Sequence, residues 1–169
     1  SGYVSFCRNE TGRLLAMLAA TRDGTMAEFG TGCGVGTAWL RSGVRGEKAR
    51  IVTAELDAKL AKAATEIFAE DPLVEVLAAD WSTLLDRGPY SLLFLDSGQP
   101  GEVGVDAIAD LVEDGGIVVL DDFTPCEQWP PITYDRVDTL RERWLTDERF
   151  TAVEVMVAPD ASTIIATKR

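Results

Sequence analysis

The chain has 169 residues, a formal net charge of −12 at pH 7 and no histidine. This negative charge argues against a nucleic-acid partner and against docking on an anionic membrane, because both need clustered lysine and arginine side chains. The absence of histidine excludes Ser-His-Asp and Cys-His catalysis and any histidine-ligated zinc site. No apolar run approaches the ~20 residues that cross a bilayer. We therefore expect a small-molecule ligand, and the three scattered cysteines favour a reducing, cytoplasmic compartment.

Hydrophobic periodicity predicts helices and strands that alternate along the chain. Helices are expected at residues 5–20, 35–42, 57–70, 82–85, 102–112 and 133–145. Strands are expected at residues 25–29, 50–54, 73–78, 90–95, 117–120, 150–157 and 162–167. Repeated strand–helix units indicate a mostly parallel sheet with helices on both faces, and the last two strands form an antiparallel hairpin. We expect a single α/β domain over residues 1–169, with an N-terminal helix within residues 1–20.

A glycine-rich turn, Glu28-Phe29-Gly30-Thr31-Gly32-Cys33-Gly34-Val35-Gly36, follows the first predicted strand. Dinucleotide-binding folds have G-x-G-x-x-G at this place, but the third glycine is replaced by Val35 or Thr37, depending on where the count starts. The E-x-G-x-G-x-G spacing favours S-adenosylmethionine, which carries no phosphate. Glu28 would attract the ammonium and sulfonium charges of this cofactor. A nicotinamide-dependent reductase has the right fold type but the wrong glycine spacing.

Acidic residues follow several of the other predicted strands, where ligands bind in open α/β sheets. Glu55 is expected to accept both ribose hydroxyls, which leaves the competing candidate Asp57 to cap the next helix. The pair Asp80-Trp81 suits an adenine, through a hydrogen bond and ring stacking, while packing of Trp81 in the core is the alternative. The residues expected to bind the cofactor are Glu28, Gly30, Thr31, Gly32, Gly34, Glu55, Leu56, Asp80, Trp81 and Asp96.

These motifs resemble those of class I S-adenosylmethionine-dependent methyltransferases, and more narrowly of the catechol and caffeoyl-coenzyme A O-methyltransferases. The likeness extends from about residue 12 to residue 169 and includes Leu93-Phe94-Leu95-Asp96 and the segment 115–122. It implies a Rossmann-like sandwich with a mostly parallel seven-stranded sheet. It also implies Mg²⁺ or another divalent cation, held by Asp96, Asp121 and Asp122, which would bind the hydroxyls of the acceptor and lower the pKa of the one to be methylated.

The sequence departs from this family at three places. Gln99 stands where the family has a lysine base, and Asp122 stands where it has an asparagine. The given sequence has few of the N-terminal helices that cover the substrate in this family, so we expect an acceptor site that is open or is completed by a partner subunit in a homodimer. The alternative to methyl transfer is therefore a cofactor-binding protein with little or no turnover.

The candidate catalytic residues are Asp96, Asp122 and Tyr134. Without histidine, proton transfer falls to carboxylates, lysine, tyrosine, cysteine or water. The proline-rich segment 123–131 precedes Tyr134 and lies where an acceptor would enter. Its Phe123 and Trp129 are candidates for an apolar wall of the acceptor site, and packing of Trp129 on the sheet is the alternative.

Overall fold

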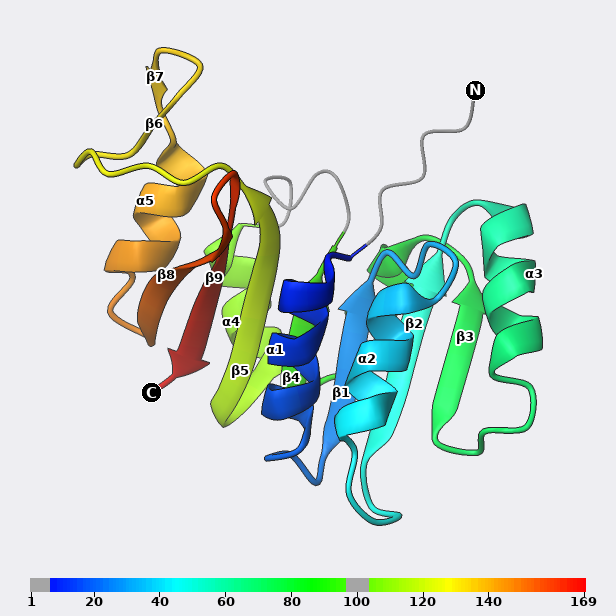
Figure 1. Ribbon diagram of the computed structural model, residues 1–169. Helices are drawn as coiled ribbons and strands as arrows, with labels where there is room; N and C mark the ends of the chain where they lie inside the picture. The colour runs from blue at the N-terminus through cyan, green and yellow to red at the C-terminus, as the bar shows by residue number, and fades with distance from the viewer. Residues whose placement is uncertain (1–6, 97–103) are drawn as a thin grey trace.

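The computed structural model describes residues 7–96 and 104–169. Its centre is a seven-stranded sheet in the order β3-β2-β1-β4-β5-β9-β8 (Figure 1). The strands are β1 Thr25–Phe29, β2 Arg50–Glu55, β3 Val74–Ala78, β4 Tyr90–Leu95, β5 Val112–Phe123, β8 Phe150–Ala158 and β9 Ala161–Lys168. The helices are α1 Asn9–Ala19, α2 Val35–Gly43, α3 Ala58–Ile67, the 3₁₀ helix η1 Trp81–Leu84, α4 Val105–Leu111 and α5 Thr139–Thr146. No helix in these two ranges is long and apolar enough to span a membrane.

The sheet is parallel from β1 to β5, and β9 runs antiparallel to both of its neighbours, β5 and β8. The predicted mostly parallel α/β sheet with an antiparallel C-terminal hairpin is therefore confirmed. All six residues of β4 are buried, as expected for a strand covered on both faces. Crossover connections of this kind place the carboxyl ends of the parallel strands along one edge of the sheet, where a ligand site forms.

Two hydrophobic clusters fill the two faces of the sheet. On one face α1 and α2 pack against the sheet through residues such as Leu15 and Leu40 (Figure 1). On the other face α4, η1 and α5 contribute residues such as Ile108 and Trp144. Because side chains alternate along a strand, neighbouring residues of β1 enter different clusters: Met26 faces α1 and α2, and Ala27 faces α4.

The prediction of a helix over residues 133–145 is partly wrong. Its first part forms a small hairpin of β6 Ile132–Thr133 and β7 Arg136–Val137, which projects beyond the sheet (Figure 1). Tyr134 and Asp135 form its two-residue turn with φ of 51° and 60°, and a helix cannot continue through such a conformation. Helix α5 begins only after Asp138, whose carboxylate accepts a hydrogen bond from the N–H of Arg141.

The strand expected over residues 117–120 is longer than predicted. Strand β5 starts at Val112, which pairs with Tyr90, and the pairing shifts register before Leu92. Gly115, at a φ of 76°, lies inside this irregular part of the strand rather than in a separate turn. The helix expected to begin at residue 102 begins at Val105 within the part of the chain that the structure describes.

Candidate active site

The glycine-rich turn joins β1 to α2 at the carboxyl edge of the sheet. Gly30, Gly32 and Gly34 have φ values of 96°, 54° and 93°, in the left-handed region that glycine adopts at little cost. The N–H groups of Gly30 and Thr31 both donate to the carbonyl of Ala54 in β2, at 3.1 and 3.2 Å. The turn is therefore tied to the neighbouring strand and can bring its backbone close to a ligand.

Glu55, the last residue of β2, holds the same turn from the side. Its Oε2 accepts a hydrogen bond from the N–H of Gly32 at 2.8 Å, and its Oε1 accepts one from the N–H of Asp57 at 2.8 Å. The carboxylate of Asp57 in turn caps α3 by accepting from two N–H groups of its first turn. The predicted capping role of Asp57 is confirmed. Leu56, between the two acids, is 73% exposed beside the turn.

Glu28 lies beneath the turn and is fully buried. The hydroxyls of Thr37 and Thr53 both donate to its Oε2, the latter at 3.0 Å. Its Oε1 has no hydrogen-bond partner in the described part of the chain and faces Gly36, where a Cβ atom would overlap it. Burial raises the pKa of Glu28 to about 8, with a smaller contribution from the charge of Glu55. In this position Glu28 supports the turn from below, and its contact with a cofactor cation stays a prediction.

Asp80 and Trp81 follow β3 at the same edge of the sheet. Asp80 caps η1 by accepting from the N–H of Ser82 at 2.9 Å. The half-buried ring of Trp81 stacks on Phe29, with the ring centroids 5.3 Å apart and the planes 19° from parallel. Trp81 therefore packs on the last residue of β1, as in the core-packing alternative, while it borders the glycine-rich turn.

A cleft of about 480 Å³ opens beside the ends of β4 and β5, and its lining includes Asp96, Asp121 and Asp122. Burial raises the pKa of Asp96 to about 8, and the charges of Glu28, Asp121 and Asp122 raise it further. Burial also raises the pKa of Asp121 to about 6, although the hydroxyl of Thr11 approaches its Oδ1 at 3.4 Å. The three candidate metal ligands thus share one cleft.

The three carboxylates do not form a metal site as they stand. Within residues 7–96 and 104–169, no group of three acidic or cysteine side chains is arranged to hold a metal ion. Asp122 is exposed and has a φ of 68°, and one oxygen of Asp121 faces the hydroxyl of Thr11. Gln99, which stands at the position of the family's lysine, lies outside the described residues. A divalent-cation site at these three acids is therefore not shown among the described residues, and the metal that the sequence suggested stays a prediction.

Tyr134 also borders this cleft, from the turn of the β6–β7 hairpin. Its side chain is 95% exposed, because the hairpin projects beyond the sheet. Phe123 lines the cleft as expected and is largely buried, whereas Trp129 is 61% exposed and does not pack into the sheet. The cleft is thus lined by the three acids and by the aromatic side chains of Phe123 and Tyr134, and Trp129 is not part of its lining.

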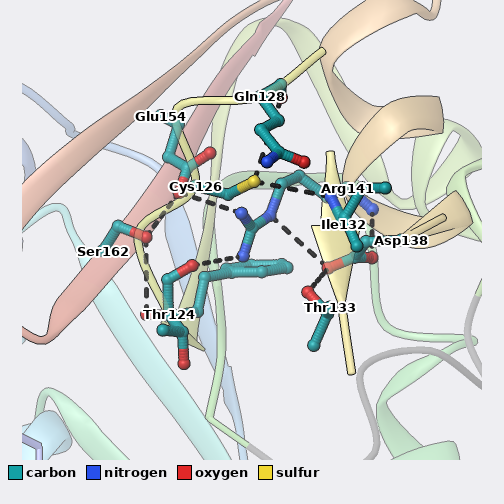
Figure 2. A network of polar contacts seen from close by, with 10 residues as sticks. Thr124, Cys126, Gln128, Ile132, Thr133, Asp138, Arg141, Glu154 and Ser162 are labelled. Atoms are coloured by element: carbon teal, nitrogen blue, oxygen red, sulfur yellow. Dashed lines mark hydrogen bonds and ion pairs between the residues drawn. The ribbon is translucent and has the colours of Figure 1, made fainter. Parts of the chain in front are cut away.

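Sequence reasoning missed Arg141, which also lines the cleft. Its side chain is buried, its guanidinium carbon lies 5.1 Å from the ring centroid of Phe123, and its Nη2 donates to the carbonyl of Thr124 at 2.7 Å (Figure 2). An arginine on a polar helix is usually solvated, so the sequence carries no signal for this burial beyond Asp138 three residues earlier.

The chain belongs to a family of methyltransferase domains, which matches residues 27–123. This segment contains the glycine-rich turn, Glu55, Asp80 and the three acids of the cleft. Comparison with curated protein sequences gives no match.

Solved structures share the fold at low sequence identity. An O-methyltransferase from Bacillus cereus in complex with S-adenosylhomocysteine is 20% identical, over 99% of this chain and 84% of its own, with a TM-score of 0.72. The O-methyltransferase TomG from Streptomyces achromogenes, in complex with S-adenosylmethionine, is 22% identical over 98% of this chain and 82% of its own, with a TM-score of 0.76. A putative caffeoyl-CoA O-methyltransferase from Staphylococcus aureus is 14% identical over 98% of this chain and 86% of its own, also with a TM-score of 0.76. The expected Rossmann-like methyltransferase fold is thereby confirmed.

Proposed function

We propose that this methyltransferase transfers a methyl group from S-adenosylmethionine to a hydroxyl group of a small-molecule acceptor. The observation that carries the proposal is the turn at Gly30–Gly34. Its glycines adopt positive φ angles, its backbone is hydrogen-bonded to β2, and it lies at the same edge of the sheet as the acidic cleft. Two structures of the same fold, from Bacillus cereus and Streptomyces achromogenes, are complexes with S-adenosylhomocysteine and S-adenosylmethionine.

The cofactor would lie across the turn and the end of β2. Glu55 uses each carboxylate oxygen once, for Gly32 and Asp57, so both oxygens keep a lone pair for the ribose hydroxyls. The exposed Leu56 and the half-buried Trp81 would flank the adenine, and Asp80 would accept from its exocyclic amine. Thr31 and the three glycines would contribute backbone carbonyl groups, because their N–H groups already donate within the chain. Asp96 would face the cationic end of the cofactor.

Methyl transfer would proceed chiefly through proximity and alignment of the acceptor oxygen with the sulfonium methyl group. Asp96 would take the proton of the acceptor hydroxyl, because its raised pKa of about 8 makes it a stronger base than an ordinary carboxylate. The oxygen then forms a bond to the methyl carbon while the carbon–sulfur bond breaks, and S-adenosylhomocysteine leaves. Asp122 and Tyr134 would orient the acceptor from the cleft rim. No step is assigned to a metal ion; a divalent cation, if bound, would be held by Asp96, Asp121 and Asp122 and would lower the pKa of the acceptor hydroxyl.

Turnover tests this proposal against a protein that only binds the cofactor. The enzyme would be incubated with methyl-labelled S-adenosylmethionine and a panel of phenols, catechols and aliphatic alcohols. Formation of S-adenosylhomocysteine together with one labelled ether supports hydroxyl methylation. Binding of the cofactor without product from any member of the panel would support the alternative, a protein without turnover. Light scattering of the same sample would show whether the chain forms the homodimer that the sequence suggests.

A further inference from the structure

Arg141 is a buried cation at the meeting point of the elements that form the acceptor side of the cleft. Its side chain is 1% exposed. Figure 2 shows its guanidinium between the segment that follows β5, the N-terminus of α5 and strand β8. Burying a charge is costly unless the surrounding groups compensate it, so this position calls for an explanation.

One set of contacts holds the chain directly after Asp121 and Asp122. The guanidinium stacks over Phe123 and donates to the carbonyl of Thr124 at 2.7 Å. Just before these residues, Asp122 has a φ of 68°, and the pairing of β5 with β9 shifts register between Leu120 and Phe123. Arg141 therefore fixes the backbone on the far side of the bend that brings Asp121 and Asp122 into the cleft.

A second set of contacts reaches the β6–β7 hairpin. Arg141 Nε lies 3.4 Å from Oδ2 of Asp138, and that oxygen accepts the hydroxyl of Thr133 in β6 at 3.0 Å. The N–H of Asp138 donates to the carbonyl of Pro131 at 2.8 Å. The guanidinium thus connects the acid-bearing end of β5 with the hairpin that carries Tyr134, and both sides of this connection line the cleft.

A third contact joins the group to the sheet. Arg141 Nη1 lies 3.6 Å from Oε1 of Glu154 in β8, and this oxygen accepts the hydroxyl of Ser162 in β9 at 2.5 Å. In the described part of the chain, Nε and Nη1 face these carboxylates without hydrogen-bond geometry. The contacts point in different directions, and only the planar guanidinium can make them together; an ammonium group cannot.

A role in stability alone explains this arrangement poorly, because an apolar side chain of similar volume often stabilises a core as well as a buried ion pair does. We propose that Arg141 is a positioning residue for methyl transfer. It fixes the Asp121–Asp122 bend and the β6–β7 hairpin relative to each other, and thereby sets the width of the acceptor cleft without touching the cofactor. This inference rests on the proposed function, because it assigns the cleft to the acceptor.

The test compares Arg141→Met and Arg141→Lys with Arg143→Met. Arg143 lies two residues further along α5, in an exposed ion pair with Asp106, and serves as the matched control. In both Arg141 variants, amide hydrogen exchange of residues 121–138 should accelerate by roughly tenfold, while exchange of residues 25–57 stays unchanged. The kcat/KM for the phenol or catechol that the wild type methylates best should fall by about 100-fold, whereas the Kd for S-adenosylmethionine stays the same. Arg143→Met should match the wild type in every measurement.

Two results would overturn the proposal. One is an Arg141→Met protein with wild-type exchange in residues 121–138 and wild-type acceptor kinetics. The other is faster exchange over the whole sheet with a parallel loss of cofactor affinity, which indicates general destabilisation. If Arg141→Met does not fold, Arg141→Lys carries the same comparison. Absence of methyl transfer by the wild type would refute the proposed function, and the exchange data would still decide whether Arg141 orders the cleft.

Discussion

Gly36 leaves open the space into which the carboxylate of Glu28 projects, because a Cβ atom at position 36 would overlap Oε1 of Glu28. Gly36 is the second residue of α2, and Glu28 comes from β1, directly beneath that helix. The last glycine of the turn therefore serves the buried acid rather than the ligand. This relationship links the first and last residues of the motif from which the cofactor is predicted.

We predict that Gly36→Ala destabilises the protein by about 1–3 kcal/mol, as expected for an overpacked site. The better helix propensity of alanine, about 1 kcal/mol, opposes this effect but does not cancel it. Urea unfolding would measure the change. In a Glu28→Ala background the same substitution should cost much less, since the overlapping group is gone. Equal costs in both backgrounds would show that Glu28 is not the obstacle.

The buried Glu28 makes stability depend on pH. Its pKa is about 8 in the folded protein, above the ordinary value of 4.5. The folded state therefore holds this proton over a range where the unfolded state has lost it, and stability falls as the pH rises from 4.5 to 8. The slope is up to about 1.4 kcal/mol per pH unit for one proton. Asp96 and Asp121 have the same sign, so Glu28→Gln should reduce the slope without abolishing it. An unchanged slope in the variant would contradict this assignment.

Substitutions at Glu55 and at Asp57 should affect different properties: the first should weaken cofactor binding, and the second should lower the stability of α3. Glu55→Ala removes the acceptor for the N–H of Gly32, and we expect it to weaken S-adenosylmethionine binding by roughly 10- to 100-fold. Asp57→Ala removes the cap of α3 and should cost about 1 kcal/mol of stability with no change in affinity. Titration calorimetry and urea unfolding on both variants check the pair. The opposite pattern would make Asp57 the ribose ligand.

Asp96 should matter for the chemical step. We expect Asp96→Asn to lower kcat by about 10²- to 10⁴-fold, because an amide cannot take the proton of the acceptor. Asp122→Asn should have a smaller effect, since Asp122 lies exposed at the cleft rim. Rates of S-adenosylhomocysteine formation would compare the two variants. Full activity of Asp96→Asn would remove the base from the proposed mechanism.

Whether the reaction needs a divalent cation can be tested at the acceptor cleft. The metal role that the sequence suggests is tested by the reaction rate in EDTA and in added Mg²⁺. A rate that EDTA lowers and Mg²⁺ restores supports a cation held by Asp96, Asp121 and Asp122, whereas a rate that neither changes contradicts it. Calorimetry with Mn²⁺ gives an independent reading that does not depend on activity. Tight binding of Mn²⁺ that is lost in Asp121→Asn would support the metal role, and absence of Mn²⁺ binding would contradict it.

Much of the fold could be predicted because it depends on local patterns. The strands β1 and β4 match their predicted bounds, since apolar runs between turn residues mark buried parallel strands. The glycine spacing likewise predicts a tight turn, and Asp57 predicts a helix cap, because both structures depend on neighbouring residues only.

The features that could not be predicted depend on contacts between distant residues. The turn at Tyr134 and Asp135 interrupts a helical pattern without glycine or proline. Arg141 is buried through Phe123, Thr124 and Glu154, which lie in other elements. The metal site at Asp96, Asp121 and Asp122 is implied by the family resemblance; the structure brings the three acids to one cleft, and their binding of a cation stays a prediction.

Binding of S-adenosylmethionine underlies every proposed step, and titration calorimetry measures it directly. We predict saturable binding of one cofactor molecule per chain at micromolar concentration, weakened in Glu55→Ala and retained in Asp57→Ala. No heat of binding at millimolar cofactor, with a correctly folded wild-type protein, would show that this chain does not bind S-adenosylmethionine.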